Sequence, residues 1–275
     1  MNIKPIIPKS TAPEPIVSVQ KVTFDYLNGQ DNPPVLEEVT LEIPDNDFLG
    51  LIGPNGGGKT TLLKILLGVE KPCSGTVHVL GRHPREVSSQ IGYVPQHAQI
   101  DASVPATVLD VVLTGCLGRS PWGVRYGRKH IDAARAAMAQ VGVEDLRKRS
   151  IGMLSGGQRQ RVLIARAMAA DAKILLLDEP LAGVDLHMEK GILELLHTLN
   201  ARLPIVLVSH DLGFVSAHVK RVACLNRRLV VHRPDEITGE VIGEMYHSHG
   251  PVLQVRHDND CPIEHDGGRD GEVTP

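Results

Sequence analysis

The sequence has few cysteines, little net charge and no long uncharged apolar run. Its four cysteines are far apart among 275 residues and form no CxxC pair, so we expect no disulfide framework and a reducing compartment. Lys and Arg number 29 against 32 acidic residues, and the net charge of -3 gives no reason to expect nucleic acid as a partner. Any polyanion must therefore be bound by a local site.

No apolar stretch has the length needed to span a membrane, and the first residues contain neither an apolar signal region nor a cleavage pattern. We therefore expect a chain that is neither exported nor inserted into a membrane by itself. Its 42% hydrophobic residues allow a sizeable core, in one large α/β unit with an insertion or in two small domains.

The order of apolar patterns predicts an α/β fold with a mostly parallel sheet. Alternating residues at 17–26 and 35–44 indicate an antiparallel hairpin, and apolar runs at 173–180 and 205–211 are separated by helical segments. A helical pattern between about 97 and 152 indicates an inserted subdomain. Residues 1–15 are interpreted as a flexible leader and 234–275 as a partly disordered tail that contains histidines.

The strongest motif is GPNGGGKT, which fits the phosphate-loop pattern and lies between an expected strand and an expected helix. Its glycines let backbone N–H groups converge on a phosphate chain, and the helix N-terminus faces the same anion. Lys59 would contact the outer phosphates, the Thr60 hydroxyl would bind Mg²⁺, and Thr61 could contact an inner phosphate. An ordinary glycine-rich turn is disfavoured by this context. The expected nucleotide-binding residues are Gly53, Pro54, Asn55, Gly56, Gly57, Gly58, Lys59, Thr60 and Thr61.

Two later apolar runs end in polar groups, and ligands of parallel sheets bind at that edge. KILLLDEP delivers Asp178, which can hold Mg²⁺ through water, and Glu179, which can orient and deprotonate the water that attacks the γ-phosphate. A helix-capping pair in a loop is the alternative for these acids. IVLVSHD brings His210 to the same edge, where it could contact the γ-phosphate or position the water, although most single histidines are structural or lie on the surface.

A second element with the chemistry of a phosphate site is LSGGQ, which opens a helix but carries no lysine. Its residues are Leu154, Ser155, Gly156, Gly157 and Gln158. A plain helix N-cap is the alternative interpretation of the serine.

The motifs GPNGGGKTT, LSGGQRQRV, ILLLDEP, LAGVD and VSHD occur in this order, and the chain resembles the ATP-binding subunits of ABC transporters. The resemblance implies an ATPase domain over residues 16–233, with a P-loop NTPase (RecA-like) core, an N-terminal antiparallel β subdomain and the helical insert. It also implies that Tyr26, more than Phe24, stacks on adenine and that Gln96 links the metal to the insert. Gly57 departs from the family pattern, which usually has Ser or Ala there.

The resemblance also implies a head-to-tail pair of nucleotide domains, expected to be a homodimer. The serine and glycines of LSGGQ in one subunit, with Asp185, would face the γ-phosphate held by Lys59 of the other. ATP would close the pair, and hydrolysis would reopen it.

Polytopic permease subunits, docked around residues 96–118, would carry the substrate and place this chain at the cytoplasmic face of the membrane. A substrate-binding protein would act only indirectly. LAGVD and CLNRRLVVH resemble the subfamily that imports zinc or manganese, and the tail could bind a metal or carry chance histidines. The alternatives are another substrate such as an iron chelate, or a soluble ABC ATPase that acts as an assembly or repair scaffold.

Overall fold

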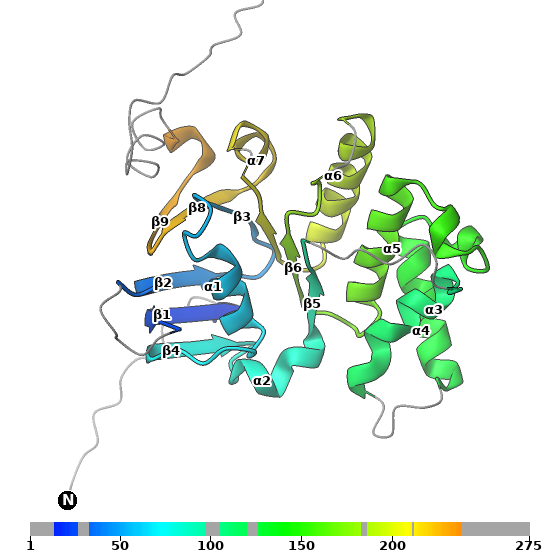
Figure 1. The fold of residues 1–275 in the computed structure, drawn as a ribbon, viewed down its shortest axis with the longest axis horizontal. Helices are drawn as coiled ribbons and strands as arrows, with labels where there is room; N and C mark the ends of the chain where they lie inside the picture. Colours follow the sequence, from blue (N-terminus) through cyan, green and yellow to red (C-terminus); the bar gives the residue numbers. More distant parts are fainter. Residues whose placement is uncertain are drawn as a thin grey trace, which may run out of the picture.

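The computed structural model describes residues 14–26, 33–96, 105–119, 126–182, 186–210 and 212–237. Two sheets organise these residues (Figure 1). The smaller sheet is antiparallel, in the order β2-β1-β4, and consists of β1 (Val17–Phe24), β2 (Leu36–Ile43) and β4 (Ser74–Val79). The hairpin predicted from the two alternating segments is therefore confirmed as β1 and β2.

The larger sheet has the order β5-β6-β7-β3-β8-β9 and is parallel except for the last pair. Every residue of its central strands β3, β6 and β7 is buried, which explains why they are continuous apolar runs in the sequence. The strands are β3 (Phe48–Ile52), β5 (Ile91–Val94), β6 (Ile174–Asp178), β7 (Ile205–Val208), β8 (Arg221–Asn226) and β9 (Arg228–His232). The predicted mostly parallel sheet is confirmed.

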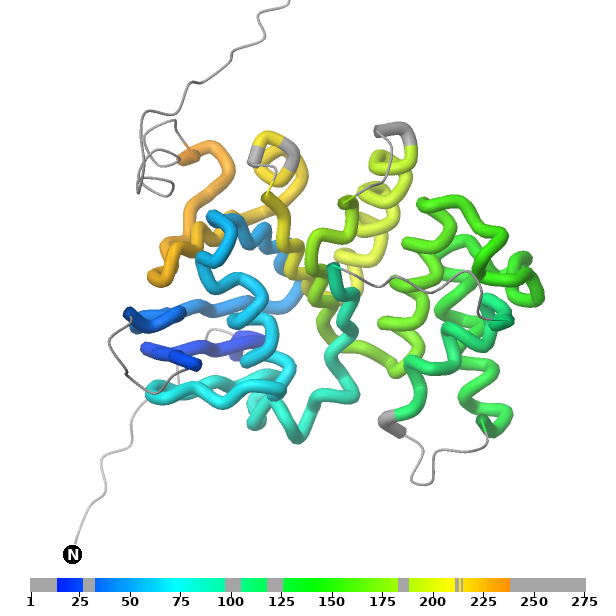
Figure 2. Tube along the Cα trace, in the orientation of Figure 1, coloured from blue at the N-terminus to red at the C-terminus, as the bar shows by residue number. Residues whose placement is uncertain are grey.

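Helices lie on both sides of the larger sheet, and three of them form a separate helical body with α5 next to the sheet (Figure 2). The helical body contains α3 (Val108–Leu113), α4 (Arg128–Gln140) and α5 (Gly156–Met168). The other helices are α1 (Lys59–Leu66), α2 (Pro84–Val87), α6 (Leu186–Asn200) and α7 (Leu212–His218). Short 3-10 turns follow at 88–90, 114–119, 144–146, 151–153 and 234–236.

The strands of the larger sheet divide the apolar residues into two cores. Alternate residues of β6 point to opposite faces, so Leu176 packs with α1 while Leu175 and Leu177 pack with α5. Helices α1 and α5 therefore cover opposite faces of one sheet. Their N-termini carry the two phosphate-type motifs of the sequence.

The helical body differs in two respects from the predicted insert. Helix α5 lies beyond the predicted end of the insert, yet it contacts both α3 and α4. Most apolar residues of α3, among them Val108, Val111 and Val112, are buried inside the body, whereas Leu109 is only partly buried. Most of the predicted leader and most of the predicted tail lie outside the described residues. Ile237 still packs against the core, four residues past Arg233.

A buried ion pair ties the larger sheet to the end of β2. Asp47 is 4% exposed, and its Oδ2 atom accepts hydrogen bonds from Arg221 Nη2 at 2.6 Å and Nε at 3.0 Å. Arg221 Nη2 also donates to the carbonyl of Glu42 at 2.6 Å. One guanidinium therefore joins the start of β8 to the chain that enters β3.

None of the helices in the described part of the chain combines the length and the apolar character that a membrane span requires.

Replacing Arg221 by Met should destabilise the protein by about 2–3 kcal/mol, because it leaves the Asp47 carboxylate buried without its cation. The partial exposure of Arg221 places the effect at the lower end for buried pairs. Urea unfolding measures the change. The matched control is Arg228→Met, which breaks the exposed pair with Glu37 and should change stability far less, because solvent screens exposed charges. Equal effects of the two substitutions would contradict the conclusion that the buried pair of Asp47 and Arg221 stabilises the fold.

Candidate functional site

The loop between β3 and α1 fits closely against the turn that joins β8 and β9. Gly53 has a φ of 155°, and a Cβ there would lie 1.9 Å from the carbonyl oxygen of Leu225. A Cβ at Gly57 would lie 2.8 Å from the same oxygen, and the Gly57 carbonyl accepts a hydrogen bond from Arg227 N at 3.2 Å. Close packing against Leu225 therefore accounts for glycine at position 57, where the family pattern has Ser or Ala.

Lys59 folds back over this loop. It is 7% exposed, and its Nζ donates to the carbonyls of Gly53 at 2.8 Å and Pro54 at 3.0 Å. Burial lowers the pKa of Lys59, while the nearby carboxylates of Glu179 and Asp178 act in the opposite direction. An ammonium group has three donors, so one remains for an anion enclosed by the loop.

Asp178 is a carboxylate almost completely removed from solvent, with 3% exposure. Burial raises its pKa, and the charge of Glu179 adds to this effect. Hydrogen bonds from Thr60, at 3.3 Å, and from Tyr93, together with the charge of Lys59, favour the ionised form instead. The hydroxyl of Thr60 and the carboxylate of Asp178 are the hard oxygen ligands that Mg²⁺ prefers, so this pair fits the predicted magnesium site.

Glu179 lies where the carboxyl ends of β5, β6 and β7 come together. Its Oε2 accepts a hydrogen bond from Gln96 Nε2 at 2.6 Å, and its Oε1 lies 3.5 Å from His210 Nδ1. The Glu179 side chain is 13% exposed and that of His210 is 66% exposed. Glu179 also adopts a left-handed φ of 48°, the kind of backbone strain that concentrates at functional sites. The structure therefore brings together the predicted base, Gln96 and His210.

The aromatic side chain expected to stack on adenine is next to the loop. Tyr26 is 50% exposed, and its hydroxyl lies 3.3 Å from the hydroxyl of Thr61. Phe24 contacts the Tyr26 ring edge-on, with centroids 4.8 Å apart, but is itself buried. Of the two rings, only Tyr26 has a face open to a ligand.

The LSGGQ segment forms the start of α5. Ser155 is its N-cap: its Oγ accepts from Gln158 N at 3.3 Å, while Gln158 Oε1 accepts from Ser155 N at 3.1 Å. The N-cap interpretation is thus correct locally, but it leaves the hydroxyl proton of Ser155 available to a ligand. A Cβ on Gly156 would meet nothing within 4 Å, so its own chain does not require glycine there. Leu154 is buried beneath the turn.

Comparison with known proteins identifies the family. The ABC transporter family model matches residues 36–182. The chain belongs to the ABC transporter family. The manganese transport system ATP-binding protein MntB of Halalkalibacterium halodurans is 39% identical, over 84% of this chain and 92% of its own length. The zinc transport system ATP-binding protein TroB of Treponema pallidum is 42% identical, over 78% and 79% of the two lengths.

A solved structure confirms the fold of this ABC protein. The ATP-binding cassette MJ0796, in a dimeric post-hydrolysis state bound to ADP and Pi, aligns with a TM-score of 0.66 and 27% identity. The alignment covers 79% of this chain and 98% of that one. The ABC protein described here is therefore an ATP-binding subunit that hydrolyses ATP.

One predicted site residue of this ABC ATPase, Asp185, lies outside the described residues. The sequence predictions also missed Tyr93, whose hydroxyl favours the ionised form of Asp178, because an aromatic side chain in a short strand ordinarily indicates only core packing. The available signal was its position three residues before Gln96, in the strand that leads to the site.

Replacing Glu179 by Gln should leave ATP binding within about twofold and lower the turnover of ATP by roughly 10²–10⁴-fold, because the amide cannot accept the proton of water. Phosphate release measures turnover, and fluorescence of a labelled ATP analogue measures binding. Lys59→Ala is the contrasting variant, since it should weaken binding itself. Near-normal turnover in the Gln variant would exclude Glu179 as the base.

Proposed function

We propose that this ABC ATPase powers the import of a divalent transition metal, manganese or zinc, through a membrane permease. The proposal is supported by relatives that are named as manganese and zinc transport ATP-binding proteins. The observation that carries the ATP-driven part is the meeting of Lys59, Asp178 and Glu179 at one sheet edge, with Gln96 and His210 beside Glu179. The relatives are components of transport systems, which favours a membrane-associated subunit over a soluble scaffold.

In this proposal the loop of residues 53–60 encloses the phosphates, and Lys59 contacts the outermost ones. Thr60 and Asp178 would hold Mg²⁺, and Gln96, which hydrogen-bonds the neighbouring Glu179, would be a further ligand. The ion supplies charge neutralisation on the phosphate oxygens. Glu179 orients the attacking water and accepts its proton, while His210 stabilises the charge that develops on the γ-phosphate.

The same chain would supply its LSGGQ segment to a second subunit. Helices α1 and α5 pack on opposite faces of the larger sheet, so the loop and Ser155 of one chain lie on either side of the sheet and do not enclose one nucleotide together. The open space at Gly156 and the remaining proton of Ser155 suit a phosphate brought by another molecule. We therefore infer a head-to-tail homodimer in which ATP lies between the loop of one subunit and the LSGGQ segment of the other.

Replacing Ser155 by Arg should prevent this closure without preventing binding of ATP to each chain, because the long side chain occupies the place of the γ-phosphate. Light scattering of the Glu179→Gln chain with Mg-ATP should show a dimer, and addition of the Ser155→Arg substitution should leave monomers. Ser18→Arg, on β1 of the smaller sheet, is the matched control and should still dimerise. A dimer that persists in the Ser155→Arg chain would contradict the arrangement.

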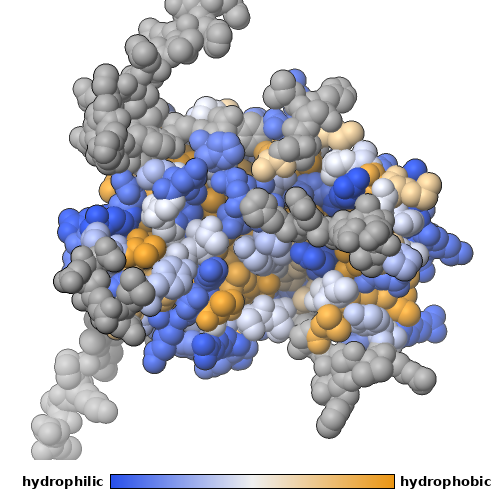
Figure 3. All heavy atoms as spheres, viewed as in Figure 1, coloured by the Kyte–Doolittle hydropathy of each residue, from blue (hydrophilic) through white to orange (hydrophobic). Residues whose placement is uncertain are grey.

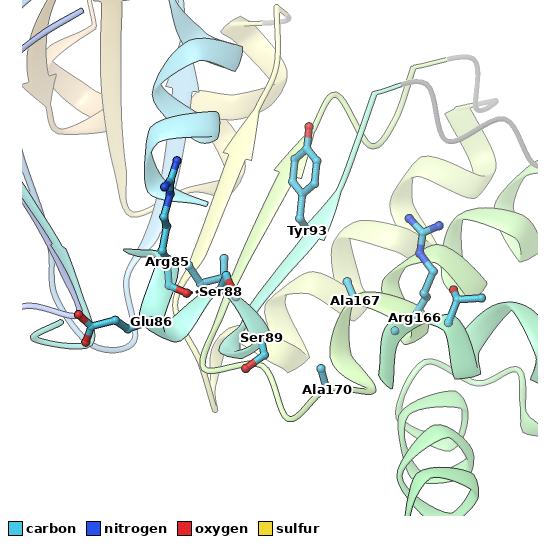
Figure 4. Close-up of a pocket in the computed structure, with 11 residues that line it drawn as sticks. Arg85, Glu86, Ser88, Ser89, Tyr93, Arg166, Ala167 and Ala170 are labelled. Carbon is cyan, nitrogen blue, oxygen red and sulfur yellow. Dashed lines mark hydrogen bonds between the residues drawn. The ribbon is translucent and has the colours of Figure 1, made fainter. Parts of the chain in front are cut away.

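A groove between α2 and the helical body provides the docking place for the permease in this proposal. It has a volume of about 650 Å³, and Figure 4 shows its two walls. One wall carries Ser89 and Tyr93, and the other carries Arg166, whose pKa is lowered by burial. Figure 3 shows that this side of the molecule is largely hydrophilic, with apolar residues in scattered patches. The groove includes Thr114 and Gly115 of the predicted docking range 96–118, whereas most apolar residues of α3 pack inside the helical body.

Metal uptake tests the proposed function directly. Cells that lack this chain should take up several-fold less radiolabelled manganese or zinc, and the wild-type chain should restore uptake while the Glu179→Gln chain should not. The matched measurement is uptake of a ferric chelate by the same cells. Loss of ferric chelate uptake alone would assign the chain to that substrate, and unchanged uptake of all three would favour a role outside transport.

A further inference from the structure

Arg161 lies on α5, in the sequence LSGGQRQRV, and follows the N-cap Ser155 by less than two helical turns. Its guanidinium donates hydrogen bonds to two other helices. Nη1 donates to the carbonyl of Val141 at 2.9 Å, and Nη2 donates to the carbonyl of Gly191 at 2.8 Å. Val141 is the C-cap of α4, and Gly191 lies in α6. One side chain therefore joins α4, α5 and α6.

The hydrogen bond to Val141 serves the end of α4. The last carbonyls of an α-helix have no partner within the helix, and a basic group near the C-terminus also suits the helix dipole. Gly142, which follows Val141, has a left-handed φ of 73°, and a Cβ there would lie 3.7 Å from Arg161 Nη1. Arg161 therefore caps α4, a helix of the helical body, from a neighbouring helix.

The hydrogen bond to Gly191 requires a close approach of two helices. A Cβ on Gly191 would lie 3.2 Å from Arg161 Nη2, which is closer than an ordinary van der Waals contact. Glycine inside a helix is less favourable than alanine, so a packing reason is expected at this position. A helical carbonyl has a second lone pair, which can accept the guanidinium beside its intrahelical bond. Glycine at 191 thus lets Arg161 reach the backbone of α6.

A second close contact lies about one turn nearer to the start of both helices. A Cβ on Gly157 would lie 2.6 Å from the Sδ atom of Met188. Gly157 precedes Arg161 on α5, and Met188 precedes Gly191 on α6. The two helices therefore lie side by side along their first turns (Figure 1). The LSGGQ segment begins one of them, and the other directly follows Asp185 in the sequence.

The proposed dimer benefits from a half-site that is fixed before the second subunit binds. The nucleotide held by one subunit would meet Ser155 and Gly156 of the other, and Asp185 is predicted to accompany them. The half-site thus draws on segments at the starts of α5 and α6. Ordering such segments during association opposes binding, whereas a half-site that is already ordered avoids this loss.

We propose that Arg161 is a positioning residue, which holds the LSGGQ segment in register with the start of α6 for the nucleotide of a second subunit. The first part of this inference, the fixed register, concerns one chain. The second part rests on the proposed function, because it requires the head-to-tail dimer. Charge alone does not suffice, since carbonyls on two helices need the planar fork of donors that arginine provides.

The first experiment measures dimer formation of the Glu179→Gln chain with Mg-ATP by sedimentation velocity. Arg161→Met should raise the dimer dissociation constant roughly tenfold, because hydrogen bonds of a charged group to two helices are lost. Binding of a labelled ATP analogue to the single chain, at concentrations too low for dimers, should change by less than about twofold, because distant sites act independently. Unchanged dimer formation in Arg161→Met would overturn the inference, and so would an equal loss of nucleotide binding.

Arg161→Lys separates geometry from charge. Lysine keeps the positive charge, but its ammonium group lacks the fixed fork that reaches two helices at once. The lysine variant should therefore dimerise about as weakly as the methionine variant. Dimer formation as strong as that of the chain with Arg161 would overturn the inference, since only the charge would then be needed.

The matched control for general destabilisation is Arg221→Met. It also removes a partly buried guanidinium, but one at the start of β8, where it bonds Asp47. This variant should be less stable in urea and should still dimerise like the chain that keeps Arg221. Thermal melting confirms that every variant is folded. An equally weakened dimer in Arg221→Met would overturn the inference, because loss of stability alone would then explain the result.

The second experiment measures the register within one chain and needs no dimer. Spin labels are attached at Met153→Cys, beside LSGGQ, and at Lys190→Cys, near the start of α6, since both positions are exposed. Cys73 and Cys261 are first replaced by Ser, and the two remaining cysteines are buried. Without nucleotide, pulsed electron paramagnetic resonance should give one narrow distance distribution with Arg161 and a broader one in Arg161→Met.

An equally narrow distribution in Arg161→Met would overturn the positioning role, whichever way dimer formation changes. A broader distribution supports the fixed register even if no chain dimerises with Mg-ATP. Absence of a dimer in the Glu179→Gln chain that keeps Arg161 would overturn the role toward a second subunit together with the head-to-tail arrangement. Failure of the proposed dimer is therefore distinguishable from failure of the register, because the distance is measured inside one chain.

Discussion

A buried carboxylate at the end of β6 is the constraint around which the nucleotide site is organised. Asp178 is enclosed by apolar strands, and burial opposes its ionisation. In the proposed function it serves as a metal ligand, and the charge of Lys59 with the hydroxyls of Thr60 and Tyr93 favours its ionised form. These residues come from the glycine loop, α1 and β5, so the placement of each element is tied to one charged group. The rest of the site, including Glu179 one residue later, follows from where β6 ends.

The larger sheet also decides which groups one chain can bring together. The glycine loop and the carboxylates Asp178 and Glu179 lie at the ends of parallel strands of one sheet, where their side chains meet. The LSGGQ segment begins a helix on the other face of the sheet. A single chain thus presents two complementary half-sites that do not meet each other, which is the condition for a nucleotide to act as the bond between two copies.

The groove lies between the helical body and the sheet that carries the nucleotide site. Its walls belong to both halves of the molecule, since Arg166 and Thr114 come from the body and Tyr93 from the sheet. Gln96 adds a second connection, because it follows β5 and hydrogen-bonds Glu179. Both connections run through the same short strand. Movement of β5 relative to β6 would therefore alter the surroundings of Asp178 and Glu179 together.

Much of this fold and site could be predicted from local sequence. The glycine loop, the apolar strand before Asp178 and the apolar run before His210 are recognisable in the sequence. The reason is that a phosphate loop requires glycines at fixed positions and a buried strand requires consecutive apolar residues. Tyr26 and Gln96 needed the family resemblance, since one aromatic or one amide has no local signature. The hairpin of β8 and β9 was not predicted as part of the site, although Leu225 closes the back of the loop.

The sequence by itself determined the chemistry available: a phosphate loop, two adjacent carboxylates, a histidine and a second glycine-rich helix start. Tertiary structure decided which of these groups meet. Strand order brought Gln96 and His210 to Glu179, strand register placed Tyr93 beside Asp178, and packing turned the apolar face of α3 inward. The physical reason is that these contacts join residues far apart along the chain, whose proximity depends on how the sheet and its helices pack.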